Sequence, residues 1–184
     1  MGALIAVAII VLLVVAAGAW YYSRQQRTKG LKENFGPEYE RALRQSDRDK
    51  GQAEGELEER RKRVEQLNLR DLTLDERRQF SAKWQNTQGH FVDDPKSAII
   101  EADTLVIELM QTIGYPMSDF EGRAADISVS HPQVVPNYRA AHAMAERNKQ
   151  GQASTEEMRQ ALVHYRSLFD ELLGASATQS EVKR

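Results

Sequence analysis

The chain contains no cysteine among its 184 residues, which excludes disulfide bonds and thiolate chemistry and leaves the redox compartment open. It also lacks any stretch in which apolar and polar residues alternate, as they must in a half-buried strand. Its glycines fall at turns and helix ends rather than in a loop that could cradle a phosphate. These absences predict an all-α protein without a nucleotide-binding loop.

Pairs of metal-ligating side chains are missing as well. The four histidines, His90, His131, His142 and His164, never stand four residues apart on one helix face, the spacing that helical zinc sites use. No serine lies in a recognisable nucleophile turn with a nameable base. We therefore expect no catalytic residue, no metal and no cofactor, and we interpret the protein as a non-enzyme.

One segment lacks charge altogether. Residues 3–22 read ALIAVAIIVLLVVAAGAWYY, and about 20 apolar residues are the length that a helix needs to cross a bilayer. The aromatic residues that end the run suit the headgroup zone. A signal peptide cleaved after Ala19 is the alternative, but no basic residue precedes the run, which also exceeds the usual signal core. The sequence thus predicts a transmembrane helix and a lipid bilayer as a partner.

The distribution of basic residues predicts the orientation. No lysine or arginine precedes the span, whereas four follow it within residues 24–32, where they can contact anionic headgroups. The bulk of the chain should then be cytoplasmic, with the N-terminus outside. Residues 71–184 hold 12 basic and 17 acidic side chains, so nucleic acid is not an expected partner.

Residues 24–70 are charged and prone to form helix, with few apolar positions. Ala53 and Leu57 belong to a thin heptad seam that Lys50 and Arg60 interrupt. We interpret this part as a charged helical stalk; a weak coiled coil, and thus weak self-association through the stalk, is the alternative.

Residues 71–174 carry repeated helix start and stop signals. Thr73 with Glu76, Asp94 with Pro95, and Ser154 with Glu157 mark helix starts, and Gly114 marks an end. The helices are expected over 73–92, 95–113, 118–130, 136–150 and 154–173. A bundle of four to five helices follows, with a disordered tail over 175–184.

Two groups of residues are candidates for function. Tyr138, Arg139, His142 and His164 lie close together on two of the expected helices, and they would serve an enzyme or a metal-binding domain if that alternative held. We interpret Tyr138 and His142 as core, because they share a face with small alanines. Ile100 and Ile107 lie opposite the main apolar face of their helix. They are either buried in a central helix or part of a partner surface with Phe91 and Tyr115, which lie at helix junctions.

A resemblance extends over most of residues 31–174. The segments FGPEY (35–39), FVDDP (91–95), GYP (114–116), ADISVSHPQVV (125–135) and RQALVHYRSLFDELL (159–173) occur in this order. The sequence resembles an uncharacterised family of single-pass membrane proteins that is widespread in actinobacteria and found in some other bacteria. The resemblance implies a compact module behind a membrane anchor in a bacterial envelope, and no assigned activity.

The sequence therefore predicts an anchor over 1–23, a stalk over 24–70, a bundle over 71–174 and a tail over 175–184. We expect a bacterial inner-membrane protein whose cytoplasmic bundle acts as a docking or scaffolding module for an unidentified protein partner.

Overall fold

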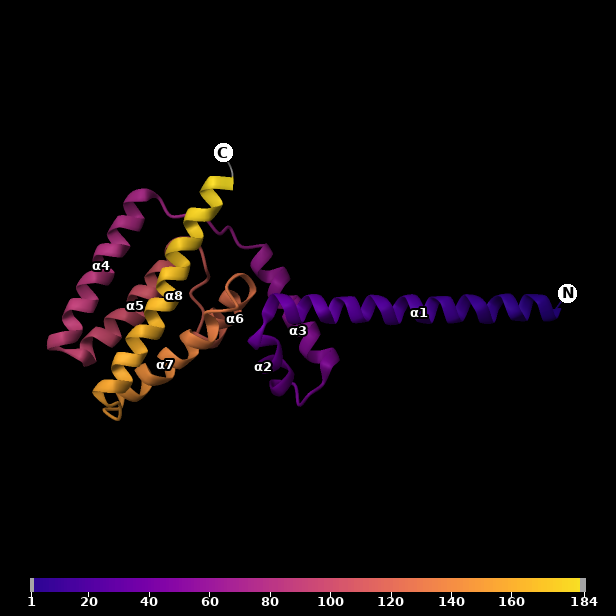
Figure 1. Ribbon diagram of the computed structural model, residues 1–184, viewed down its shortest axis with the longest axis horizontal. Coiled ribbons are helices and arrows are strands. Elements are labelled where there is room, and N and C mark those ends of the chain that lie inside the picture. The colour runs from indigo at the N-terminus through magenta and orange to yellow at the C-terminus, as the bar shows by residue number, and fades with distance from the viewer. Residues whose placement is uncertain (1, 183–184) are drawn as a thin grey trace. The chain divides into compact units, whose positions relative to one another are not determined.

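The computed structural model describes the backbone of residues 2–182 and the side chains of residues 12–174. Within this range all of the regular secondary structure is helical, with no strand, which confirms the all-α prediction. The chain divides into two compact units, Met1–Glu58 and Glu59–Arg184. Figure 1 labels the helices.

The first unit contains α1 (Gly2–Phe35), α2 (Pro37–Gln45) and the first part of α3 (Lys50–Glu65). The prediction of a solvated stalk is wrong for this part of the chain. Gly36 ends α1 with a positive φ of 48°, and the turn before α3 holds Asp47 and Arg48 at positive φ. The chain thus folds back on itself and buries six apolar side chains: Leu31, Phe35, Tyr39, Ala42, Ala53 and Leu57.

Because the chain folds back, the residues of the heptad seam pack inside the chain. Ala53 and Leu57 are fully buried within the chain, so they are not an exposed stripe through which a coiled coil could self-associate. The Asp49 carboxylate caps the start of α3 by accepting hydrogen bonds from the amides of Gly51 and Gln52. A cap at this point separates two short helices where the sequence suggested one long helix.

No helix in the part of the chain whose side chains are described is long and apolar enough to cross a membrane. The predicted span begins at residue 3, and residues 3–11 lie outside that part.

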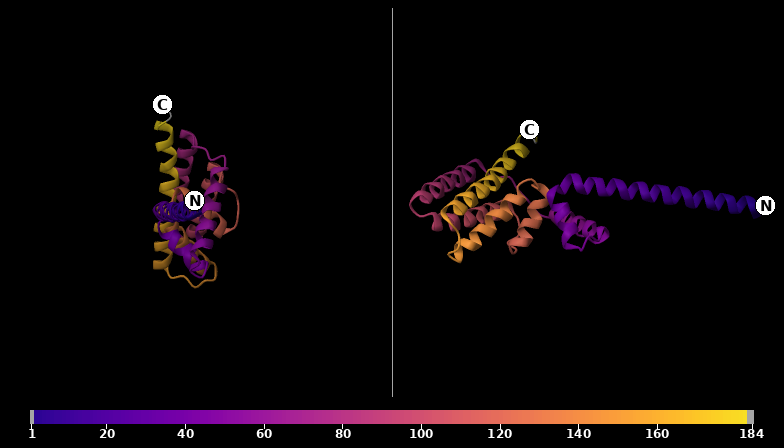
Figure 2. Two further views of the ribbon diagram at one scale, coloured as in Figure 1. Left: turned by 90° about the vertical axis from the view of Figure 1, so that its right-hand side faces the viewer. Right: turned by 60° about the horizontal axis from the view of Figure 1, so that its bottom comes forward.

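The second unit is a bundle of five helices, α4 (Leu74–Asp93), α5 (Pro95–Ile113), α6 (Phe120–Ser130), α7 (Val135–Lys149) and α8 (Thr155–Val182). The predicted bundle is therefore confirmed. Helix α5 packs against α4, α7 and α8, while α7 and α8 pack against each other. Figures 1 and 2 show α8, in yellow, running along the bundle. Helix α5 is the central helix, because nine of its residues are buried.

The predicted caps hold the helix ends in place. Thr73 and Glu76 form a reciprocal capping box, and Asp94 accepts a hydrogen bond from the Ser97 amide with Pro95 in the first turn. Gly114 ends α5 at a φ of 110°, and a Cβ there would lie 2.8 Å from the Asn68 carbonyl oxygen. Glycine is required at this position both by the backbone conformation and by the close approach of the preceding segment.

Two helix boundaries differ from the prediction. Asp119 caps α6 by accepting a hydrogen bond from the Gly122 amide, so this helix begins at Phe120 and not at Ser118. Helix α8 continues past Gly174 to Val182, where we expected an end at Leu173. Of the tail that we expected to be disordered over 175–184, residues 175–182 belong to α8, and residues 183–184 lie outside the described part of the chain.

The bundle also begins earlier than predicted. Leu67 and Leu69 pack against its core, and the Arg70 amide donates a hydrogen bond to the Ile113 carbonyl. Arg63 forms an ion pair with the buried Asp126, at 2.7 Å. Residues before 70 therefore belong to the folded bundle.

Candidate functional site

Three of the four predicted cluster residues, Tyr138, Arg139 and His142, gather around Phe120 of α6. The His142 ring stacks on the Phe120 ring, with centroids 3.7 Å apart and planes at 9°. The Tyr138 ring meets the same phenylalanine at 5.0 Å, and the Arg139 guanidinium lies 5.8 Å from its centre. The structure thus places Phe120, which the sequence did not single out, at the centre of this group.

Arg139 and Tyr138 each bind a charged residue of α6. Arg139 Nη1 donates to Glu121 Oε2 at 2.7 Å, and the Arg139 side chain is only 14% exposed. Arg123 Nε donates to the hydroxyl oxygen of Tyr138 at 3.1 Å. Burial raises the pKa of the Tyr138 phenol, and the nearby Arg123 charge opposes that shift. These contacts fasten α7 to α6.

His142 is half-buried, and its Nδ1 atom has no hydrogen-bond partner among the described residues. Burial lowers the pKa of the imidazole, because the charged form loses hydration, while the negative charge of Asp103 acts in the opposite direction. Because the Phe120 ring covers one face of the imidazole ring, no other group can stack on that face. The surroundings of this histidine favour a neutral ring packed against an aromatic neighbour.

A buried carboxylate, that of Asp103, lies near this group. The Tyr165 hydroxyl of α8 donates to Asp103 Oδ1 of α5 at 2.9 Å, and both residues are buried. Burial, followed by the charge of Asp103, raises the pKa of Tyr165, so the phenol keeps the proton that it donates. The sequence alone did not indicate that Asp103 takes part in this contact. Its spacing was the available signal: Asp103 stands four residues after Ile99 and three before Val106. Because both of these residues are fully buried, Asp103 lies on the buried face of the helix.

His164 is separate from the other predicted residues: none of the interactions in the described part of the chain joins it to Tyr138, Arg139 or His142. Over that part, no three side chains of the metal-ligating types converge in a way that could hold a metal ion. The arrangement that is present joins α5, α6, α7 and α8 through paired polar groups inside the bundle. The contacts join α5 to α8 and α6 to α7.

The second candidate site is a groove between α4 and α5, with a volume of about 370 Å³. Lys83 of α4 forms an ion pair with Glu108 of α5 at 2.7 Å, and His90 contacts Glu101 at 3.1 Å. The two contacts bridge the helices at either end of the groove. Between them the groove is lined by Asn86, Thr87, Ile100, Thr104 and Leu105.

Ile100 is the apolar residue of this groove that faces solvent. Its side chain is 47% exposed, and it lies one turn before Thr104, which is also exposed. The interpretation that Ile100 is buried in a central helix is therefore wrong, and the alternative of an exposed apolar position holds for it. Ile107, two turns further along, is half-buried.

The other two residues predicted for the partner surface belong to the interior. Tyr115 is buried in the core cluster. Phe91 is half-buried and packs against the same core. These aromatic residues close the ends of the bundle, so the candidate surface is reduced to the α5 residues Ile100 and Ile107 and the groove beside them.

No family of known proteins matches the sequence, none of the curated proteins matches it, and no solved structure matches the fold. The resemblance to a bacterial membrane family thus stays a prediction.

Proposed function

We propose that this protein is a non-enzymatic docking module whose α4–α5 groove holds a helix of a partner protein. The observation that carries the proposal is Ile100, an apolar side chain that is 47% exposed inside a groove of about 370 Å³. Removing such a surface from water is favourable, and a partner side chain that enters the groove would cover it. Helices commonly bind in grooves of this kind through a few apolar anchor residues.

The charges around the groove indicate the composition of the partner. The lining of the groove includes two carboxylates, Glu101 and Glu108, and one ammonium group, Lys83, which pairs with Glu108. Residues 71–184 also carry a net charge of −5. A partner helix with one apolar anchor and at least one basic residue beside it is complementary to this rim. The polar side chains of Asn86, Thr87 and Thr104 can hydrogen-bond to polar groups on that helix.

We further propose that residues 3–22 anchor the protein in a bacterial inner membrane, with the bundle on the cytoplasmic side. The support for this part is the sequence: an uncharged apolar run of about the right length, and basic residues only after it. A phosphatase reporter fused after Arg184, active only when exported, should remain inactive. Strong activity would contradict the orientation.

The docking proposal is tested by placing a photo-crosslinking amino acid at Ile100 in the full-length protein in cells. The matched control places it at Val163, which is 53% exposed on α8, away from the groove. We expect a discrete crosslinked protein from position 100 and not from position 163. The purified partner should then bind the wild-type protein. Ile100→Glu should weaken that binding at least about tenfold, as expected for an anchor residue. Val163→Glu should leave the affinity unchanged.

Three outcomes would refute the proposal. Equal crosslinking from both positions would show that the groove is not selective. A crosslink only to a second copy of the chain would make the groove a self-association surface. A partner that binds Ile100→Glu and wild type equally well would bind elsewhere.

A further inference from the structure

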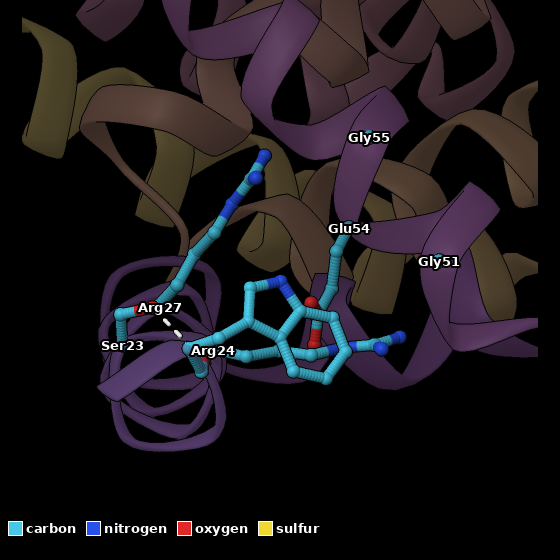
Figure 3. A pocket seen from close by; sticks show the side chains of 7 residues that line it. Ser23, Arg24, Arg27, Gly51, Glu54 and Gly55 are labelled. Carbon is cyan, nitrogen blue, oxygen red and sulfur yellow. Dashed lines mark hydrogen bonds between the residues drawn. The ribbon is translucent and has the colours of Figure 1, made fainter. Parts of the chain in front are cut away.

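A cavity of about 500 Å³ lies in the first unit, between α1 and α3 (Figure 3). Helix α1 contributes side chains to one wall, and α3 contributes mostly bare backbone to the other. The residues that matter here are Trp20, Arg24, Arg27, Gly51, Glu54 and Gly55.

The cavity exists because two residues of α3 have no side chain. Gly51 and Gly55 stand four positions apart and therefore share a helix face. A Cβ at Gly55 would meet nothing within 4 Å, and one at Gly51 would approach only the Asp49 carboxylate, at 3.3 Å. Neither glycine has a positive φ, and glycine is among the least favourable residues inside a helix. Backbone geometry therefore does not require them, and their effect is to keep this space open.

Two arginines supply the charge of the cavity. Arg24 and Arg27 are three positions apart on one face of α1, and Figure 3 shows both side chains at the cavity. The Arg24 guanidinium lies 5.3 Å from the centre of the Trp20 ring. Over the described residues neither arginine forms an ion pair, whereas the neighbouring Lys29 and Lys32 pair with Glu33 and Glu40. The two guanidinium groups therefore lack a negative counterpart.

Glu54 is the carboxylate within the cavity, and its charge is already balanced. Its Oε1 atom accepts hydrogen bonds from the Thr28 hydroxyl at 2.8 Å and the Tyr39 hydroxyl at 3.0 Å. Lys50 lies 3.8 Å from the same oxygen. Glu54 thus ties α3 to α1 and α2 and leaves Arg24 and Arg27 to bind another anion.

We propose that this cavity binds a phosphate group through Arg24 and Arg27. A guanidinium presents paired N–H donors that match the oxygens of a phosphate, and two such groups on one helix face can hold one phosphate between them. Trp20 forms the adjoining wall, on which an uncharged part of the ligand can rest. The phosphate belongs either to a lipid headgroup or to a small soluble molecule, and the site requires the same chemistry for both. The inference does not depend on the docking groove.

The test follows the indole N–H resonance of Trp20 by NMR in the full-length protein in nonionic detergent micelles. One arm adds glycerol 3-phosphate or inorganic phosphate, and the other adds phosphatidylglycerol or phosphatidylcholine to the micelles. We expect a saturable shift. Replacing both arginines (Arg24→Gln with Arg27→Gln) should weaken binding at least about tenfold, because charge-assisted hydrogen bonds are lost. The matched control, Lys29→Gln with Arg44→Gln, removes the same charge outside the cavity and should change affinity by less than about twofold.

Gly55→Leu provides a second variant, because it fills the cavity without removing a charge. It should abolish the shift while circular dichroism shows that helicity is retained. Saturation by soluble phosphates identifies a small-molecule site, and saturation by phosphatidylglycerol alone identifies a lipid headgroup. No saturable response to any phosphate would overturn the proposal. The proposal would also be overturned if the double arginine variant and its control lost the same amount of phosphate affinity. The same holds if Gly55→Leu bound phosphate as well as the wild type.

Discussion

The hydrogen bond between Tyr165 and Asp103 offers the sharpest test of the bundle interior. Tyr165→Phe removes one hydroxyl from a side chain with no exposed surface and changes nothing else in the packing. The lost bond, 2.9 Å long, leads to a carboxylate that is itself buried. A hydrogen bond to a charged group contributes about 1.5–3 kcal/mol, and the carboxylate would be left without this donor. We expect the free energy of unfolding to fall by about this amount.

Thermal and urea unfolding, followed by circular dichroism, would measure the loss. For a unit of this size, 1 kcal/mol corresponds to about 4 °C in Tm, so Tyr165→Phe should lower Tm by about 6–12 °C. Tyr165→Ala also removes the ring and should lower the free energy of unfolding by about 3–5 kcal/mol. The difference between the two variants separates the hydrogen bond from the packing of the ring.

Tyr22→Phe is the control, since its side chain is 64% exposed and the hydroxyl that it loses lies at the surface. It should change stability by less than about 0.5 kcal/mol. If Tyr165→Phe were as stable as this control, Asp103 would not depend on the tyrosine, and our account of the interior would fail.

Two further predictions concern His142 and the boundary of the bundle. Because burial lowers the folded-state pKa of His142 below 6.5, its contribution to stability is complete above pH 6.5 and is lost as the pH falls toward the folded-state pKa. His142→Gln should lower the free energy of unfolding by about 1 kcal/mol at neutral pH, because the stacking of the imidazole ring on Phe120 is lost. In urea titrations on both sides of pH 6.5, the difference between variant and wild type should shrink on the acid side; a constant difference would contradict the burial of the ring. A fragment that begins at Glu59 should melt cooperatively and at a higher temperature than one that begins at Asp71. The shorter fragment lacks Leu67 and Leu69, whose partial burial is worth about 1–3 kcal/mol in all. Equal melting temperatures would restore the boundary that the sequence suggested.

The helix ends of the bundle could be predicted because their determinants are local. Thr73 with Glu76, and Asp94 with Pro95, satisfy amides within the next three residues. Gly114 provides the left-handed conformation that ends α5. Such signals act over three or four residues and need no knowledge of what packs nearby. The same holds for the apolar stripe of α8, whose Tyr165, Leu168 and Phe169 are all buried.

The candidate sites could be predicted only in part. Tyr138 and His142 stand four positions apart on one helix, and the sequence therefore indicated that they could meet. Their shared neighbour Phe120 lies on another helix, and Asp103 meets Tyr165 across 62 positions of the chain. The helical pattern of α5 also could not show that Ile100 faces the groove beside α4. Which polar residue is paired, and which apolar residue remains exposed, depends on how the helices are placed.

The sequence by itself determined that this protein is helical, where most of the bundle helices begin, and that its first apolar run differs from everything after it. Composition and capping suffice for these features, because each is a property of a few neighbouring residues. Only the tertiary structure decided that residues 24–58 fold back, that Gly51 and Gly55 open a cavity beside Arg24 and Arg27, and that Asp103 is buried. Each of these depends on contacts between segments far apart in the chain. Such contacts form only where the packing of several helices together outweighs the conformational entropy that the chain loses.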